Sequence, residues 1–204
     1  MSKLQVDWSW RNFHALVTDV DHPTAPPLYQ VKWHALTKPH LVFTRPETGE
    51  VFGTGTLHAV RIHADYTVAG RTGTLHAQKR LQTLYTHQSY AYADADADAS
   101  LDSSTNRPPV TMTWTSDSNF TRWDFVCSDE RLRPVARYSA RLWGVKKIGV
   151  VEFMDDRELS EQQREEIVVV GMTLAYCMLL RVNNVFNLLG AALPKKKPED
   201  SGSS

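Results

Sequence analysis

Short runs of alternating apolar and polar residues fill the first 155 residues of this chain. Between residues 29 and 35, Tyr29, Val31 and Trp33 fall on one side of an extended chain, and Gln30 and Lys32 fall on the other. Similar β-prone runs follow, separated by turns rich in Gly, Pro, Asn and Asp. They occupy residues 40–44, 51–63, 74–92, 110–115, 121–127, 134–142 and 148–154. The pattern predicts a mostly β protein with about 10–12 antiparallel strands.

The alternation stops in one stretch near the C-terminus, where a long helix is predicted over residues 160–189. Ser160 and Gln163 have the spacing of a capping box, and Gly190 supplies a stop signal. Residues 167–180 carry no polar stripe at helical spacing, so this segment must be enclosed on every side by protein or by lipid.

Lipid is the less favoured of these two environments. A membrane-spanning helix needs about 20 predominantly apolar residues. The apolar run here ends after residue 180, where Arg181 follows, and Lys195, Lys196 and Lys197 lie beyond the helix. A sheet with many strands hides its edges by closing, and a barrel with more than about eight strands has room inside. The sequence therefore predicts a closed antiparallel β-barrel that encloses the apolar C-terminal helix.

The predicted domain organisation is a single barrel domain over residues 28–193. A separate N-terminal segment is predicted for residues 1–27, and a disordered tail for residues 194–204. Residues 93–109 combine an Asp-Ala repeat with Ser, Thr, Asn and Pro, and this composition predicts a mobile loop. The loop lacks the Gly and Glu that a calcium-binding loop starting at Asp94 requires.

Several segments follow in an order that resembles a known group of proteins. The segments are residues 123–125 (Trp-Asp-Phe), 136–140 (Ala-Arg-Tyr-Ser-Ala) and 146–153 (Lys-Lys-Ile-Gly-Val-Val-Glu-Phe), followed by the apolar helix. With the strands before them, they resemble the tubby C-terminal-like superfamily, which includes tubby domains, phospholipid scramblases and LURP-one-related proteins. The resemblance spans residues 28–190 and implies a β-barrel around a C-terminal helix. Tubby domains bind phosphoinositides through basic side chains, but no stretch here matches that site residue by residue.

Composition and motifs limit the classes of partner and of reaction that are expected for this chain. The chain has 23 basic and 23 acidic residues, which disfavours nucleic acid as a partner. The N-terminus lacks a secretory signal, so a cytoplasmic location is predicted, with contact to a membrane surface left open. The two cysteines, Cys127 and Cys177, suggest packed thiols. No phosphate loop, dinucleotide fingerprint, nucleophile elbow or zinc-protease motif occurs, and His58 and His63 do not have the spacing of a ligand pair on one strand. Neither a cofactor nor a metal site is predicted.

The first functional hypothesis is a non-enzymatic binding or adaptor module. Its barrel surface would recognise anionic lipid headgroups or a protein partner. The candidate residues are basic and cluster in one part of the sequence, and the four arginines share odd numbering, which favours one strand face. They are Arg131, Arg133, Arg137, Arg141, Lys146 and Lys147.

The second hypothesis is a cofactor-independent enzyme of the isomerase or cyclase type. It would act on a small apolar metabolite in a pocket at the mouth of the barrel, where aromatic residues converge. The candidate aromatic residues are Trp33, Trp114, Trp123 and Trp143, and no catalytic residue is predicted. The sequence predicts no particular oligomeric state.

Overall fold

The structure is a computed structural model of the full chain. It describes residues 2–9, 13–58, 62–79, 82–95, 108–116, 122–141, 149–154 and 159–192. Parts of the predicted mobile loop, all of the predicted tail, and both Lys146 and Lys147 lie outside these residues.

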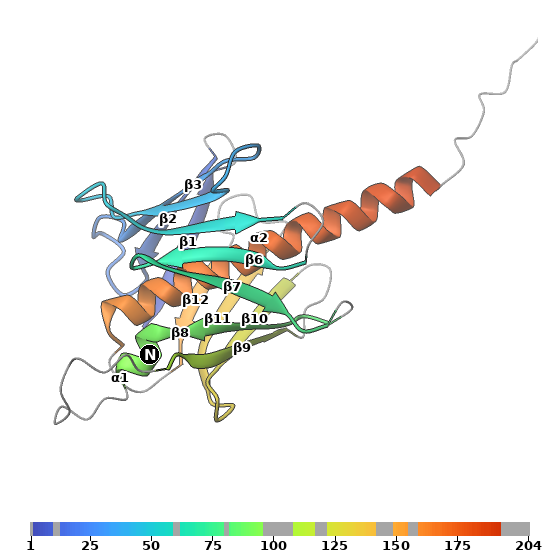
Figure 1. Cartoon of the computed structure of the whole chain (residues 1–204). Helices are drawn as coiled ribbons and strands as arrows, with labels where there is room; N and C mark the ends of the chain where they lie inside the picture. Colours follow the sequence, from blue (N-terminus) through green and yellow to red (C-terminus); the bar gives the residue numbers. More distant parts are fainter. Residues whose placement is uncertain are drawn as a thin grey trace, which may run out of the picture.

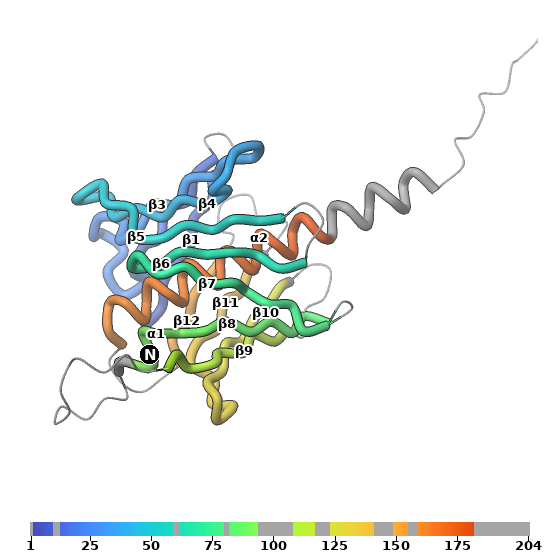
Figure 2. Tube along the Cα trace, in the orientation of Figure 1, coloured from blue at the N-terminus to red at the C-terminus, as the bar shows by residue number. Residues whose placement is uncertain are grey.

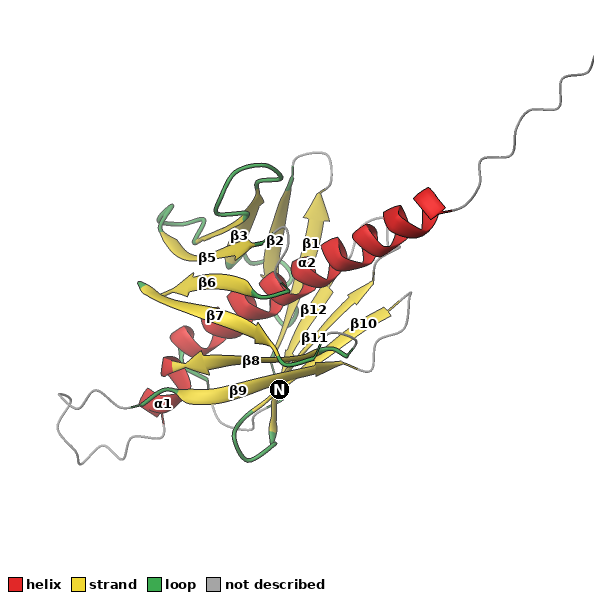
Figure 3. Ribbon diagram, turned by 45° about the vertical axis from the view of Figure 1, so that its right-hand side comes forward, coloured by secondary structure: helices red, strands yellow, loops and turns green. Residues whose placement is uncertain are grey.

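Twelve antiparallel strands form one closed barrel (Figures 1 and 3). Each strand pairs with its neighbours in sequence, and β1 closes the barrel by pairing with β12, with Leu4 opposite Val151. Figure 2 follows this path around the barrel from blue to orange. The prediction of a closed antiparallel barrel with about 10–12 strands is confirmed. The strands are β1 (Lys3–Ser9), β2 (His14–Asp19), β3 (Tyr29–Trp33), β4 (Leu41–Thr44), β5 (Val51–Leu57), β6 (Ala64–Val68), β7 (Arg71–Ala77), β8 (Leu84–Ser89), β9 (Val110–Ser116), β10 (Arg122–Ser128), β11 (Pro134–Arg141) and β12 (Gly149–Phe153).

The barrel begins earlier in the chain than the sequence predicted. Residues 1–27 were expected outside the barrel domain, but they contain both β1 and β2. Leu4 and Val6 on β1, and Ala15 and Val17 on β2, are buried at every second position. These strands therefore follow the same alternation as the rest of the barrel, and without them β3 and β12 would leave two open sheet edges.

Two helices accompany the barrel. The short helix α1 (Tyr90–Ala95) follows β8, and α2 (Glu161–Ala192) has 32 residues. α2 packs against β5, β6 and β11, and its side chains from Glu165 to Leu174 are buried. Among the described residues, no helix is long and apolar enough to cross a membrane.

Strand β5 approaches α2 closely because of its glycines. A Cβ atom on Gly53 would lie 2.5 Å from Val169 Cγ2, and one on Gly55 would lie 2.4 Å from Thr173 Oγ1. Residues two apart share a face of a strand, and residues four apart share a face of a helix. The two glycines thus form a flat strip under two successive turns of α2.

The meander brings alternate loops to the same end of the barrel. α2 begins at one end, where Glu161 and Glu165 contact Arg45 in the turn between β4 and β5. We call this the Glu161 end. At the opposite end, Arg181 donates a hydrogen bond to Tyr85 Oη at 2.6 Å, and Cys177 Sγ lies 3.7 Å from the carbonyl of Ile62. We call this the Arg181 end.

Candidate functional site

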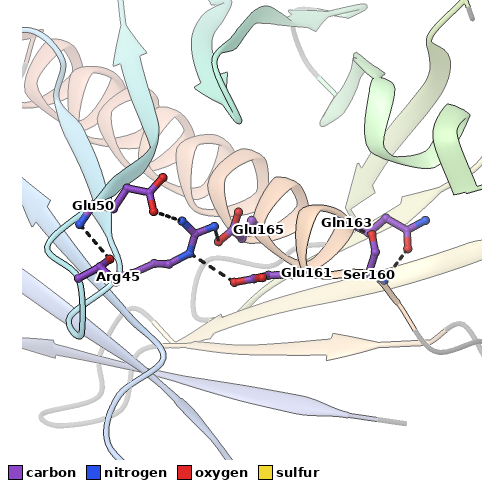
Figure 4. A network of polar contacts seen from close by, with 7 residues as sticks. Arg45, Glu50, Ser160, Glu161, Gln163 and Glu165 are labelled. Carbon is purple, nitrogen blue, oxygen red and sulfur yellow. Dashed lines mark hydrogen bonds and ion pairs between the residues drawn. The ribbon is translucent and has the colours of Figure 1, made fainter. Parts of the chain in front are cut away.

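At the Glu161 end, one arginine ties the first turns of α2 to a barrel turn (Figure 4). The guanidinium of Arg45 contacts Glu50 at 2.6 Å, Glu161 at 3.3 Å and Glu165 at 2.6 Å. The predicted capping box is present beside this network, because Ser160 N–H donates to Gln163 Oε1 at 2.9 Å and Gln163 N–H donates to Ser160 Oγ at 3.3 Å. Acidic side chains are favourable here because the helix dipole is positive at its N-terminus.

Of these acidic groups, Glu165 is the most buried. Its side chain is 1% exposed, whereas that of Glu161 is 68% exposed. Burial raises the pKa of Glu165 above its ordinary value and outweighs the opposing effect of Arg45. The free-energy cost of removing this carboxylate from water is therefore larger than the stabilisation that Arg45 provides.

One helical position further on, Glu166 belongs to a separate polar chain that reaches into the core. Its Oε1 lies 3.3 Å from His87 Nε2, and Trp114 Nε1 lies 3.2 Å from His87 Nδ1. A tryptophan indole can only donate, so His87 Nδ1 must accept and the imidazole proton must sit on Nε2. His87 therefore donates to Glu166, and all three side chains are buried.

Glu166 also forms the floor of a pocket of about 140 Å³. The walls come from the turn between β6 and β7, the end of β8, α1 and the first turn of α2. Arg71 at the rim lies over the ring of Tyr90, 4.6 Å from its centroid. Tyr66 donates its hydroxyl to the carbonyl of Gln88 at 2.9 Å, and burial, followed by the charge of Glu166, raises the pKa of Tyr66. The lining residues include Tyr66, Val68, Arg71, Ala91, Gln162 and Glu166.

Both cysteines are packed thiols, as the sequence predicted. Cys127 is fully buried and Cys177 is 6% exposed. Burial raises the pKa of both thiols, so they stay protonated at neutral pH and are poor nucleophiles. Within the described ranges, no group of three or more His, Cys, Asp or Glu side chains could hold a metal ion.

The basic residues chosen from sequence do not gather in one place. Arg131 and Arg133 lie in the turn before β11, at the Glu161 end, and Arg141 closes β11 at the Arg181 end. At about 3.3 Å per residue, these two sets are roughly 23 Å apart. Arg137 lies between them on the outward side of β11, alternating with buried Ala136 and Tyr138.

Acidic neighbours also offset part of this charge. Arg133 is paired with Asp129 through contacts of 2.6 Å and 2.8 Å, and Arg137 Nε lies 3.6 Å from Asp124 Oδ1. Although burial acts in the opposite direction, the hydrogen bonds from Arg133 hold the pKa of Asp129 below its ordinary value. The Arg131 to Arg137 part of the predicted surface is therefore a mixed-charge region.

A different concentration of positive charge follows from the alternation of loops. The connections that close hairpins at the Arg181 end are residues 10–13, 34–40, 58–63, 78–83, 117–121 and 142–148. In the sequence they contain seven basic residues and one acidic residue, Asp117. The basic residues are Arg11, Lys38, Arg61, Lys79, Arg80, Lys146 and Lys147.

The connections at the Glu161 end have the opposite balance. They are residues 20–28, 45–50, 69–70, 90–109, 129–133 and 154–160. Their sequence contains five basic residues, Arg45, Arg107, Arg131, Arg133 and Arg157, and twelve acidic ones. The acidic residues are Asp21, Glu47, Glu50, Asp94, Asp96, Asp98, Asp102, Asp129, Glu130, Asp155, Asp156 and Glu158. Counting only the described residues, the connections at the Arg181 end hold two basic residues, Lys38 and Lys79, and no acidic one, whereas those at the Glu161 end hold three basic and six acidic ones. For the described residues, charge is thus separated along the barrel axis.

Each connection at the Arg181 end also carries at least one large apolar residue. Leu36 is 97% exposed and Phe13 is 57% exposed.

The four tryptophans of the enzyme hypothesis do not line a common pocket. Trp33 stacks on Trp8 at 3.7 Å and contacts Tyr176 near the Arg181 end. Trp114 is fully buried beside His87, and Trp123 is 5% exposed and packs against Phe125. Trp143 lies outside the described residues. None of the other three lines the pocket above Glu166.

Sequence reasoning missed the pocket and the charged ends for different reasons. Glu166, His87 and Trp114 are far apart in sequence and carry no motif. The basic end could have been predicted from the sequence, because every second turn of an antiparallel meander lies at the same end of the sheet.

Comparison with family models, curated proteins and solved structures finds no match for this chain. The resemblance to the tubby-like superfamily therefore stays a prediction.

Proposed function

We propose that this chain is a non-enzymatic β-barrel module that binds anionic lipid headgroups at a membrane surface through its Arg181 end. The observation that carries the proposal is the charge balance of the described connections at that end, which hold Lys38 and Lys79 and no acidic residue beside exposed Leu36 and Phe13. A membrane interface offers both matching partners, because anionic headgroups attract the cations and the acyl boundary accepts Leu36 and Phe13.

The long-range field of the molecule supports the same orientation. The acidic connections at the Glu161 end are repelled by an anionic membrane, while the basic connections at the Arg181 end are attracted to it. Lys195, Lys196 and Lys197 follow α2 in the sequence and add charge beyond its C-terminal part. This orientation differs from docking along the side of the barrel, which the run from Arg131 to Lys147 suggested in the sequence.

The proposal includes the barrel enclosing the apolar segment 167–180 on all sides, as the sequence predicts. Burial of the side chains from Ile167 to Leu174, and the contacts of α2 with strands from different parts of the barrel, support this. With that segment occupied inside the barrel, membrane contact falls to the connections rather than to the helix core.

Vesicle cosedimentation tests the proposal. The protein is mixed with vesicles of phosphatidylcholine alone or with added phosphatidylserine, at low and at moderate ionic strength. We expect binding only to the vesicles with phosphatidylserine, and we expect it to weaken as salt rises. Each basic residue near an anionic surface contributes about 1 kcal/mol, so the exposed pair Lys38→Glu and Lys79→Glu should weaken binding by about thirtyfold or more.

A matched double reversal at the other end is the control. Arg131→Glu with Arg133→Glu removes the same charge at the Glu161 end and should leave vesicle binding unchanged. Thermal unfolding of both variants checks that each is folded. The proposal fails if neither lipid binds, or if the control pair weakens binding as much as Lys38→Glu with Lys79→Glu.

A further inference from the structure

We infer that the pocket at the Glu161 end binds a small organic ammonium cation with an apolar body. The pocket lies at the opposite end of the barrel from the proposed membrane surface, and the inference does not depend on that proposal. It rests on three features: Glu166 has a donor for only one of its two carboxylate oxygens among the described residues, the walls are partly apolar, and the pocket is small.

Glu166 is a buried acidic side chain with too few donors. Only 3% of the residue is exposed, and among the described residues its one polar side-chain partner is His87, at 3.3 Å. The hydroxyl of Tyr66 is committed to the carbonyl of Gln88, so it does not donate to Glu166. Arg45 is committed to the neighbouring carboxylates instead. A buried carboxylate is costly unless it is paired and fully hydrogen-bonded, which leaves a site for a donor with positive charge.

The walls above Glu166 favour a compact ligand that is apolar over much of its surface. Val68, Ala91 and the ring of Tyr66 line the pocket, and Gln162 and Arg71 stand at its rim. An aromatic ring face also attracts a cation. The volume of about 140 Å³ is close to that of cavities that accept a benzene-sized molecule.

Three probes of similar shape isolate the effect of charge. Benzylammonium, benzyl alcohol and benzoate share a ring and differ in charge. We expect benzylammonium to bind the full-length protein. Benzyl alcohol should bind with an affinity at least about tenfold lower, and benzoate should not bind. Calorimetric titration gives the affinities. The NMR signal of the Trp114 indole N–H should shift with benzylammonium, because His87 links that indole to Glu166.

Two variants and one control locate the site. Glu166→Gln keeps an acceptor for His87 and removes the charge, so benzylammonium should bind no better than benzyl alcohol. Gln162→Lys places a cation four residues before Glu166 on the same helix face. The new lysine should form an ion pair with Glu166 and abolish probe binding. Glu161→Gln removes an exposed carboxylate outside the pocket and should leave the affinity unchanged.

The outcomes decide the inference even if one variant does not fold. Gln162 is exposed, so Gln162→Lys tests the site without altering the buried floor. The inference is overturned if benzylammonium does not bind, if benzoate binds as tightly as benzylammonium, or if the folded variants at positions 162 and 166 keep the affinity of the wild type.

Discussion

Gly53 and Gly55 show how single residues set the spacing between barrel and helix. Neither position has room for a Cβ, because Val169 and Thr173 occupy the space where it would be. Thr173 is itself fixed, since its hydroxyl donates to the carbonyl of Val169 at 2.7 Å. At positions 53 and 55, the absence of side chains therefore sets how closely β5 approaches α2.

Replacing Gly55 by alanine should destabilise the protein by about 1–3 kcal/mol, the usual cost of overpacking a filled interior. Thr173→Ala removes both Thr173 atoms that such a Cβ would meet. The double variant should therefore lose less stability than the sum of the two single variants, by more than the roughly 0.5 kcal/mol scatter of independent sites. Chemical denaturation of the four proteins measures this coupling.

Thr54→Ala is the matched control, because Thr54 lies between the two glycines and is only half-buried. It should change stability little, and it should not couple to Thr173→Ala. Strict additivity between Gly55→Ala and Thr173→Ala would contradict the close contact seen here.

At the scale of the element, the first two turns of α2 concentrate acidic side chains with different partners. Glu161 and Glu165 face Arg45, whereas Glu166 faces His87 and the pocket. The side chains of Glu165 and Glu166 are almost fully buried, which is unusual for charged residues. The start of the helix is therefore the part of α2 whose stability should respond to pH.

Glu165→Gln should reveal this response. A carboxyl whose folded pKa is raised holds its proton more tightly in the folded than in the unfolded chain. Its ionised form lowers stability at neutral pH, and the loss is recovered as pH falls through the folded pKa. Relative to wild type, Glu165→Gln should gain stability at pH 7, and this gain should disappear by about pH 4, near the unfolded value.

Denaturant unfolding at a series of pH values measures the difference between the two proteins. Glu161→Gln, on the exposed carboxylate that contacts the same arginine, should show no comparable recovery. A stability difference between wild type and Glu165→Gln that stays constant from pH 7 to pH 4 would mean that burial does not control this carboxyl.

At the scale of the whole molecule, α2 packs closely against side chains of the barrel. Inward side chains from many strands are fully buried, including Phe43, Tyr85 and Trp114. Gly171 of α2 shows how close this packing is, because a Cβ there would lie 3.0 Å from the Trp114 ring. If the barrel encloses the helix as proposed, removing the helix would leave these side chains facing an empty or water-filled space.

A chain truncated before Glu161 should therefore fail to fold. The cavity left by the helix would far exceed that of any single large-to-small substitution, each of which already costs about 2–5 kcal/mol. Circular dichroism during heating should show no cooperative transition for this chain. Removal of residues 193–204 alone is the control and should leave the melting temperature unchanged. Cooperative unfolding of the longer truncation at the wild-type temperature would show that the barrel does not need α2.

The charge separation along the barrel axis also belongs to this scale. It arises from connections that are scattered through the sequence and that the meander sorts into two sets. The same sorting moved Arg131 and Arg133 away from Arg141, although all three lie within eleven consecutive residues. Distance in sequence was therefore a poor guide to which cations act together.

The sequence by itself determined most elements of this protein, although β1, β2 and the short helix α1 were not predicted. Alternation along β3 specified a strand, and the spacing of Ser160 and Gln163 specified the start of α2, because these patterns depend on neighbours a few residues apart. The number of strands and the need for closure also followed from local patterns, since unpaired sheet edges are unfavourable. The start of the barrel at residue 28 was misplaced because proline-rich residues 23–27 look like a boundary, although they only connect two barrel strands.

Only the tertiary structure decided which residues from distant parts of the sequence contact one another. The chain from Trp114 through His87 to Glu166 joins two neighbouring strands to a helix that comes about 50–80 residues later in the chain, and no local pattern encodes that contact. The pocket likewise exists because the β6–β7 turn, α1 and α2 meet at one end of the barrel. Pairing partners and barrel ends arise from strand order and closure, which are properties of the whole chain. For that reason the candidate sites emerged from the fold, while most strands and the helix α2 could be predicted beforehand.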